Sequence, residues 1–76
     1  MNRIRRQQLS KLNEKLEELK NELETLKEEE EDYRDNIPEN LQGSERYERA
    51  DEACDSMDDA VSNLEDAISG IEAAIE

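Results

Sequence analysis

The chain lacks most of the residue types from which catalytic and metal sites are built. Its 76 residues contain no His, no Trp and no Phe, and only one Cys, one Pro and two Gly. Hydrolysis and group transfer need a nucleophile, a matched base and a site sheltered from water. The remaining candidates are surface carboxylates, hydroxyls and the single cysteine. We therefore expect no enzymatic activity, no cofactor and no metal.

Long apolar runs are also missing. No stretch approaches the roughly 20 residues needed to cross a bilayer, and no apolar signal-peptide segment follows the basic start at Arg3, Arg5 and Arg6. The lone Cys54 cannot form an internal disulfide, which is typical of a reducing compartment, and its acidic neighbours disfavour a thiolate. These features predict a cytoplasmic protein that makes no membrane contact.

Charge of one sign dominates, and it is unevenly spread. The chain has 23 acidic and 10 basic residues, for a net charge of −13. Residues 1–27 hold seven basic and five acidic residues (+2), whereas residues 28–76 hold three basic and eighteen acidic ones (−15). From Ala50 onward there are nine acids and no base. Such a surface repels nucleic acid, so we expect no direct nucleic-acid binding.

Heptad spacing of apolar residues predicts two long helices. In the first, the leucines alternate steps of three and four, which is the a/d pattern of a coiled coil. No Pro or Gly interrupts residues 2–36, so we expect a helix over about residues 2–35. The leucines are Leu9, Leu12, Leu16, Leu19, Leu23 and Leu26.

A connection over about residues 36–44 follows. Pro38 disfavours helical backbone at the residue before it, Gly43 can break the chain, and Ser44 is a good N-cap. The second helix should therefore span about residues 45–74.

Apolar side chains are expected to close this end of the molecule. Residues 38–42 can form a single helical turn, with Ile37 and Leu41 plugging the end of the hairpin. Tyr33 and Tyr47 are expected to stack there.

The second helix repeats its heptad four times and carries a wider apolar stripe. Its a and d positions hold Tyr47, Ala50, Cys54, Met57, Val61, Leu64, Ile68, Ile71 and Ile75. Small residues line the adjoining flank: Ala53, Ala60, Ala67, Ala74, Ser56, Asn63 and Gly70. This flank is either a thin exposed surface or a docking face for a second hairpin. Since a lone two-helix seam is marginally stable, we favour a homodimeric four-helix assembly.

The two stripes fit an all-α, antiparallel two-helix hairpin that forms a single domain over residues 1–76. An antiparallel seam pairs a with d positions, as in Leu9–Ile71, Leu12–Ile68, Leu16–Leu64, Leu19–Val61, Leu23–Met57 and Leu26–Cys54. The flanking e positions then bring opposite charges together in Lys27–Asp51, Lys20–Asp58 and Arg6–Glu72, with Asn13 beside Glu65.

Acidic residues provide the candidate binding surface. Glu52, Asp59 and Asp66 recur every seven residues, about 10.5 Å apart at helical rise, and form what we call the acidic ridge. We assign a denser cluster, Glu28, Glu29, Glu31 and Asp32, to the same partner-binding surface. A line of carboxylates can imitate nucleic-acid phosphates and occupy a basic groove. A solvated surface that maintains solubility is the alternative. The spacing of a calcium-binding loop is absent.

A resemblance adds to this interpretation. Residues 36–48, Asn-Ile-Pro-Glu-Asn-Leu-Gln-Gly-Ser-Glu-Arg-Tyr-Glu, precede Asp/Glu-Ala heptads and follow a Met-Asn-Arg-Ile-Arg-Arg start. Together they resemble short uncharacterised proteins of phages and mobile elements of Gram-positive bacteria. The resemblance implies a small accessory protein without assigned enzymatic activity, and it transfers no functional residues.

Two functional hypotheses follow. The first is an acidic inhibitor that occupies a basic groove of a nucleic-acid-handling or host-defence protein in the bacterial cytoplasm. The second is a structural coiled-coil scaffold whose charge only maintains solubility. We favour the inhibitor because the acids from Ala50 onward have no basic residues in their own helix.

Overall fold

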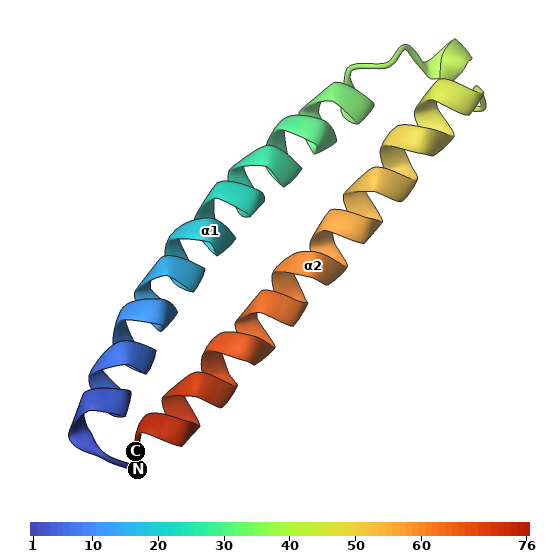
Figure 1. Cartoon of the computed structure of the whole chain (residues 1–76). Coiled ribbons are helices and arrows are strands. Elements are labelled where there is room, and N and C mark those ends of the chain that lie inside the picture. The colour runs from blue at the N-terminus through green and yellow to red at the C-terminus, as the bar shows by residue number, and fades with distance from the viewer.

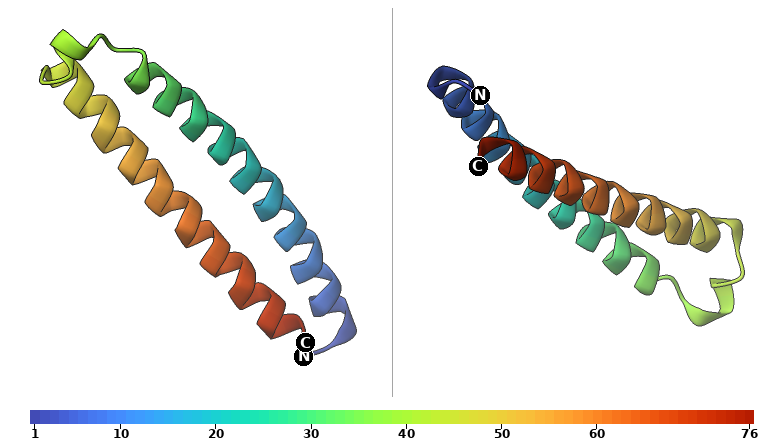
Figure 2. Two further views of the ribbon diagram at one scale, coloured as in Figure 1. Left: turned by 180° about the vertical axis from the view of Figure 1, so that it is seen from behind. Right: turned by 90° about the horizontal axis from the view of Figure 1, so that it is seen from below.

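The computed structural model describes all 76 residues as a helical hairpin (Figure 1). Helix α1 spans Arg3–Asp35, a short 3₁₀ helix η1 spans Glu39–Leu41, and helix α2 spans Glu45–Ile75. The helices run antiparallel along a rod of 59 × 14 × 13 Å, and the two termini meet at its open end (Figures 1 and 2). The predicted all-α two-helix hairpin is confirmed, and both helices begin and end within one residue of the expected bounds.

Side-chain caps set where each helix begins. The Asn2 carboxamide oxygen accepts a hydrogen bond from the Arg5 backbone N–H at 2.7 Å. At the start of α2, the Ser44 hydroxyl accepts one from the Tyr47 N–H at 3.3 Å. Each cap satisfies a backbone donor that the first helical turn leaves free. The predicted Ser44 cap is therefore confirmed.

The connection closes the hairpin with one apolar side chain instead of two. The predicted helical turn is present as η1, where the Leu41 N–H donates to the Pro38 carbonyl at 2.8 Å. Ile37 is buried at 4% exposure, whereas Leu41 remains 44% exposed. Ile37 acts as the expected plug, and the same expectation for Leu41 is wrong because the turn directs its side chain toward solvent.

The seam predicted for the second helix is confirmed. Four of its side chains, Ala50, Cys54, Val61 and Ile68, are buried. They are neighbours on one face of α2, and the remaining a and d side chains beside them are half-buried. The core of the hairpin is therefore a single strip along α2.

Helix α1 meets this strip with a different face from the predicted one. Its a-position leucines are half-buried, but Leu12, Leu19 and Leu26 are about half exposed, at 48%, 54% and 56%. Asn13 is buried instead, and the later e positions Lys20, Lys27 and Arg34 are half-buried. The predicted burial of Leu12, Leu19 and Leu26 against α2 is therefore wrong.

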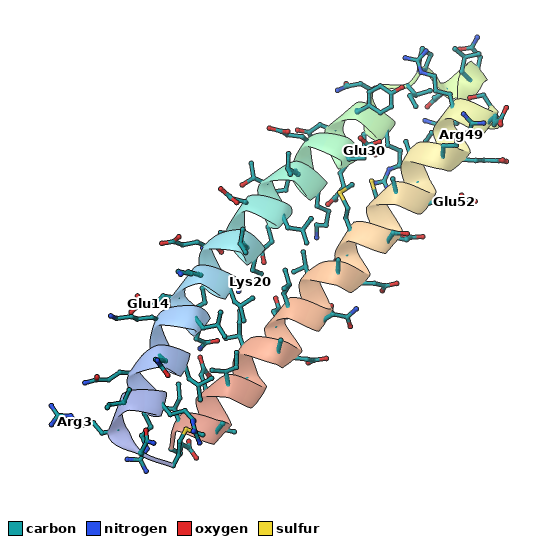
Figure 3. All side chains as sticks on the ribbon, in the orientation of Figure 1. Arg3, Glu14, Lys20, Glu30, Arg49 and Glu52 are labelled. Atoms are coloured by element: carbon teal, nitrogen blue, oxygen red, sulfur yellow. The ribbon has the colours of Figure 1, made fainter.

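A rotation of α1 explains the difference. Centring the contact on positions a and e instead of a and d turns the helix by about 50° about its own axis at 3.6 residues per turn. This rotation lays the long aliphatic stems of the basic e-position side chains along α2, while the charged ends of Lys27 and Arg34 reach acidic partners there. Figure 3 shows Lys20 on the side of α1 that faces α2, and Glu14 and Glu52 on the outer sides of the hairpin.

Candidate protein-interaction surfaces

Ion pairs mark one long side of the hairpin. The Lys27 ammonium lies 3.1 Å from an Asp58 carboxylate oxygen, and the Arg34 guanidinium lies 3.0 Å from Asp51. The e positions of the two helices are side by side, as predicted. The individual pairs differ by one heptad, because Lys27 pairs with Asp58 instead of Asp51. The predicted Lys27–Asp51 and Lys20–Asp58 pairs are therefore wrong.

These contacts shift the titration of both basic groups. The hydrogen bond to Asp58 raises the pKa of Lys27, and the nearby charges of Asp58 and Glu31 raise it further. For Arg34, a hydrogen bond to Asp35 and a second to Asp51 raise the pKa above its already high ordinary value. Both groups therefore stay charged at neutral pH and keep their contacts to α2.

Cys54 lies beneath this side and is unsuited to nucleophilic chemistry. Its side chain is buried at 5% exposure. Burial raises the pKa of the Cys54 thiol, and the charges of Glu31, Glu30 and Asp51 add to this rise, while Arg34 opposes it. The sequence pointed to acidic neighbours, and the structure adds burial as the main cause. The thiol is protonated at neutral pH.

The acidic ridge is present as a line along α2. Glu52, Asp59 and Asp66 are all exposed, and none of them takes part in an ion pair. They occupy one heptad position on the face of α2 directed away from the buried strip. Their carboxylates are therefore free to meet a partner.

The denser acidic cluster lies elsewhere, on α1. Glu28, Glu29, Glu31 and Asp32 spread over about 160° of the circumference of the helix, with Glu28 and Asp32 one turn apart on the same face. Glu31 faces the ion-paired side, where it lies 3.7 Å from Lys27. The structure thus does not bring this cluster and the acidic ridge together on one surface.

The opposite long side of the hairpin carries small and apolar residues. Its closed end is marked by Tyr33, whose hydroxyl accepts a 2.7 Å hydrogen bond from the Arg46 guanidinium. That guanidinium lies 5.5 Å from the centre of the tyrosine ring. The expected Tyr33–Tyr47 stack is therefore replaced by a cation–π contact to the neighbouring Arg46.

The small residues predicted as an oligomer face follow Arg46 along this side. Ala53 and Ala60 are half-buried, and the other members are exposed, namely Ala67, Ala74, Ser56, Asn63 and Gly70. Leu12, Leu19 and Leu26, which the heptad pattern placed in the hairpin core, also remain about half exposed. The run of basic e positions on α1 is the sequence signal that could have indicated this exposure. Basic side chains can face the acidic α2 in place of the leucines.

No group of three or more His, Cys, Asp or Glu side chains is arranged to hold a metal ion. Neither helix combines the length and apolar character required to cross a membrane. No protein family, curated protein or solved structure shows significant similarity to the chain.

Proposed function

We propose that this chain is a non-enzymatic, homodimeric interaction protein whose acidic ridge occupies a basic groove of a partner protein. The observation that supports this most is the state of Glu52, Asp59 and Asp66, which are exposed and free of ion pairs. All the basic residues that pair across the hairpin lie on α1 and serve Asp51 and Asp58. The ridge therefore keeps its full charge for a partner.

The chemistry of the ridge indicates the class of partner. Carboxylates aligned along a rigid helix present a negative line comparable to a nucleic-acid backbone, and a groove that binds phosphates is lined by Lys and Arg. A nucleic-acid-handling or host-defence protein is thus the proposed target. Charge attraction of this kind accelerates association and is screened over about 8 Å at physiological ionic strength.

The resemblance of residues 36–48 and their flanking segments supports the proposed setting. An accessory protein of a phage or mobile element would act in the cytoplasm of its bacterial host, where such targets are abundant.

A second candidate function is a coiled-coil oligomerisation module without a nucleic-acid-like role. It is favoured by the exposure of Leu12, Leu19 and Leu26, because a line of half-exposed leucines is typical of a surface that another helix covers. The two functions can coexist if assembly uses one side of the hairpin and the acidic ridge lies on another.

A pull-down from bacterial lysate tests the ridge. The bait proteins are the wild type, a Glu52→Gln, Asp59→Asn, Asp66→Asn variant, and a matched control that neutralises three exposed α1 residues, Glu14→Gln, Glu17→Gln, Glu18→Gln. We expect the ridge variant to lose its basic partners at moderate salt while the control retains them. Equal recovery by all three baits would favour the oligomerisation module. Equal loss by both variants would show that net charge matters, and not the ridge.

A further inference from the structure

A line of apolar side chains on α1 is left about half exposed by the hairpin. Leu12, Leu19, Leu26 and Tyr33 are 48%, 54%, 56% and 44% exposed and recur every seven residues, and we call them the leucine column. Isolated exposed leucines are ordinary in proteins, but a continuous line marks an interaction surface. Only six of the 76 residues are buried in the hairpin, so its own core is small for independent stability.

This column shares one side of the hairpin with small residues of α2. Tyr33, its last member, contacts Arg46. Arg46 stands one heptad before Ala53 on the same face of α2. The continuation of that face is the alanine column, Ala53, Ala60, Ala67 and Ala74. The two columns therefore form one long surface, the leucine–alanine face, on the side opposite the Lys27–Asp58 ion pair.

We infer that a second copy of this chain docks on the leucine–alanine face in antiparallel orientation, with a two-fold axis beside Leu19. In this arrangement Leu19 meets its own copy, and Leu12 meets Leu26 of the second copy. The inference rests on the homodimer of the proposed function and is independent of the acidic ridge. It adds α1 to an interface that the sequence placed on α2 alone.

Charge complementarity selects this register. The column that borders the leucines on the outer side of α1 holds Gln8, Lys15, Glu22 and Glu29. With the axis beside Leu19, each Lys15 lies opposite Glu22 of the second copy. A shift by one heptad would place a like-charged pair on the axis itself, Lys15 opposite Lys15 in one direction or Glu22 opposite Glu22 in the other, although the second shift keeps Lys15 opposite the acidic Glu29. The region around the axis also belongs to residues 1–27, whose net charge is +2 in an otherwise acidic chain.

The position of α2 fits the same axis. Leu19 lies two heptads before Tyr33, and Ala60 lies two heptads after Arg46, so the Tyr33–Arg46 contact places Leu19 level with Ala60. The ion pairs on the opposite side give a second estimate. Leu19 lies eight residues before Lys27, and Asp66 lies eight residues after Asp58, so the Lys27–Asp58 pair places Leu19 level with Asp66. The Arg34–Asp51 pair gives the same offset. The axis therefore passes α2 within residues 60–66.

The alanine column is symmetric about the middle of that segment. A two-fold axis there places Ala60 opposite Ala67 and Ala53 opposite Ala74 of the second copy. Small side chains at these positions permit close approach of the two α2 helices. A single axis thus satisfies both helices and closes a four-helix bundle.

The dimensions of the hairpin suit such an interface. A long side of 59 by 14 Å covers roughly 800 Å², the area that each partner contributes to a standard protein interface. The acidic ridges of the two copies remain outside it, because they lie on the face of α2 directed away from the bundle.

Disulfide cross-linking between copies tests the inference, in a Cys54→Ala background so that no other thiol is present. Leu19→Cys should cross-link to itself under mild oxidation. Leu12→Cys and Leu26→Cys should cross-link when mixed, but not when each is alone. The exposed Asn21→Cys serves as the control and should stay reduced. Self-linking of Leu12→Cys and Leu26→Cys would indicate parallel docking and overturn the inference, as would failure of Leu19→Cys to link.

A charge exchange provides a second readout that leaves the leucines intact. Lys15→Glu and Glu22→Lys should each weaken the dimer about tenfold, because each creates two like-charge contacts across the axis. The double variant should recover wild-type affinity in sedimentation equilibrium. A monomeric wild type at high micromolar concentration, or a double variant as weak as the singles, would overturn the inference. None of these outcomes depends on whether the acidic ridge binds a partner.

Discussion

The Lys27 ammonium lies 3.1 Å from the Asp58 carboxylate, across the seam between α1 and α2. One heptad nearer the closed end, Arg34 makes the equivalent contact to Asp51 at 3.0 Å. The two pairs hold the basic e positions of α1 against α2, so the leucine column is turned outward. We expect these side-chain charges to favour the orientation of α1 that leaves Leu12, Leu19 and Leu26 available for assembly.

Exchanging the charges of the Arg34–Asp51 pair should reveal this orienting role. Arg34→Glu and Asp51→Lys should each lower the thermal midpoint measured by circular dichroism, because each places two carboxylates or two cations in contact. The double variant should recover most of the loss. In 1 M salt, where charges are screened beyond about 3 Å, the single variants should approach the wild type. Effects that persist unchanged in high salt would exclude an electrostatic role.

Asn13 gives the opposite prediction, a gain of stability. Its carboxamide oxygen is buried without a hydrogen-bond partner, and the residue is only 8% exposed. Leaving such a group unpaired costs about 1–3 kcal/mol, so Asn13→Leu should raise the free energy of unfolding by about that amount in urea titrations. Asn21→Leu, at an exposed position of the same helix, is the control and should have little effect. Destabilisation by Asn13→Leu would show that the carboxamide is satisfied in solution.

The closed end should depend on Ile37 far more than on Leu41. Ile37 is 4% exposed and Leu41 is 44% exposed. Truncating a buried isoleucine costs about 2–5 kcal/mol, comparable to the roughly 3–5 kcal/mol that a core of this size supplies. We expect Ile37→Ala to abolish most of the cooperative unfolding transition at low protein concentration and Leu41→Ala to retain it. Equal effects of the two variants would contradict the assignment of Ile37 as the plug.

Alkaline pH should destabilise the fold in two stages. The pKa of Cys54 is raised by burial above its ordinary value of 9.0, and that of Lys27 is raised by the bond to Asp58 above 10.5. A group whose pKa is higher in the folded state contributes stability that is present below its unfolded pKa and lost above it. The free energy of unfolding should therefore be constant between neutral pH and about pH 9 and fall beyond it. Cys54→Ala should remove the first stage and leave the stage above pH 10.5, and an unchanged profile for this variant would contradict the burial of the thiol.

The sequence predicts α2 well and α1 only in part. The buried strip of α2 follows from its heptads, because Val61 and Ile68 have no competing apolar face. On α1 two arrangements satisfy the same pattern, since Leu19 can face either α2 or a second copy. The pairing of Lys27 with Asp58 distinguishes these two arrangements. That pairing depends on the offset of α1 against α2 along the hairpin, which the connection between the helices allows. Leu41 illustrates a similar limit, because periodicity cannot indicate which side of a 3₁₀ turn faces solvent.

The placement of the candidate surfaces follows the same division. Glu52 and Asp66 form a line because heptad spacing on one helix is sufficient to align them. How α1 and α2 are turned relative to one another does not follow from spacing on either helix. The separation of the Glu28–Asp32 cluster on α1 from the ridge on α2 could therefore not be predicted.

The leucine–alanine face and the pairing of basic α1 residues with Asp51 and Asp58 both depend on how α1 sits against α2, so the most direct test measures which residues are neighbours across the seam. In a Cys54→Ala background, a short bis-maleimide linker would be applied to Lys27→Cys/Asp58→Cys and to Lys27→Cys/Asp51→Cys, with intramolecular products identified by mass. We predict rapid linking of the first pair and slow linking of the second. Faster linking of the Lys27→Cys/Asp51→Cys variant would contradict the observed register and, with it, the outward position of the leucine column.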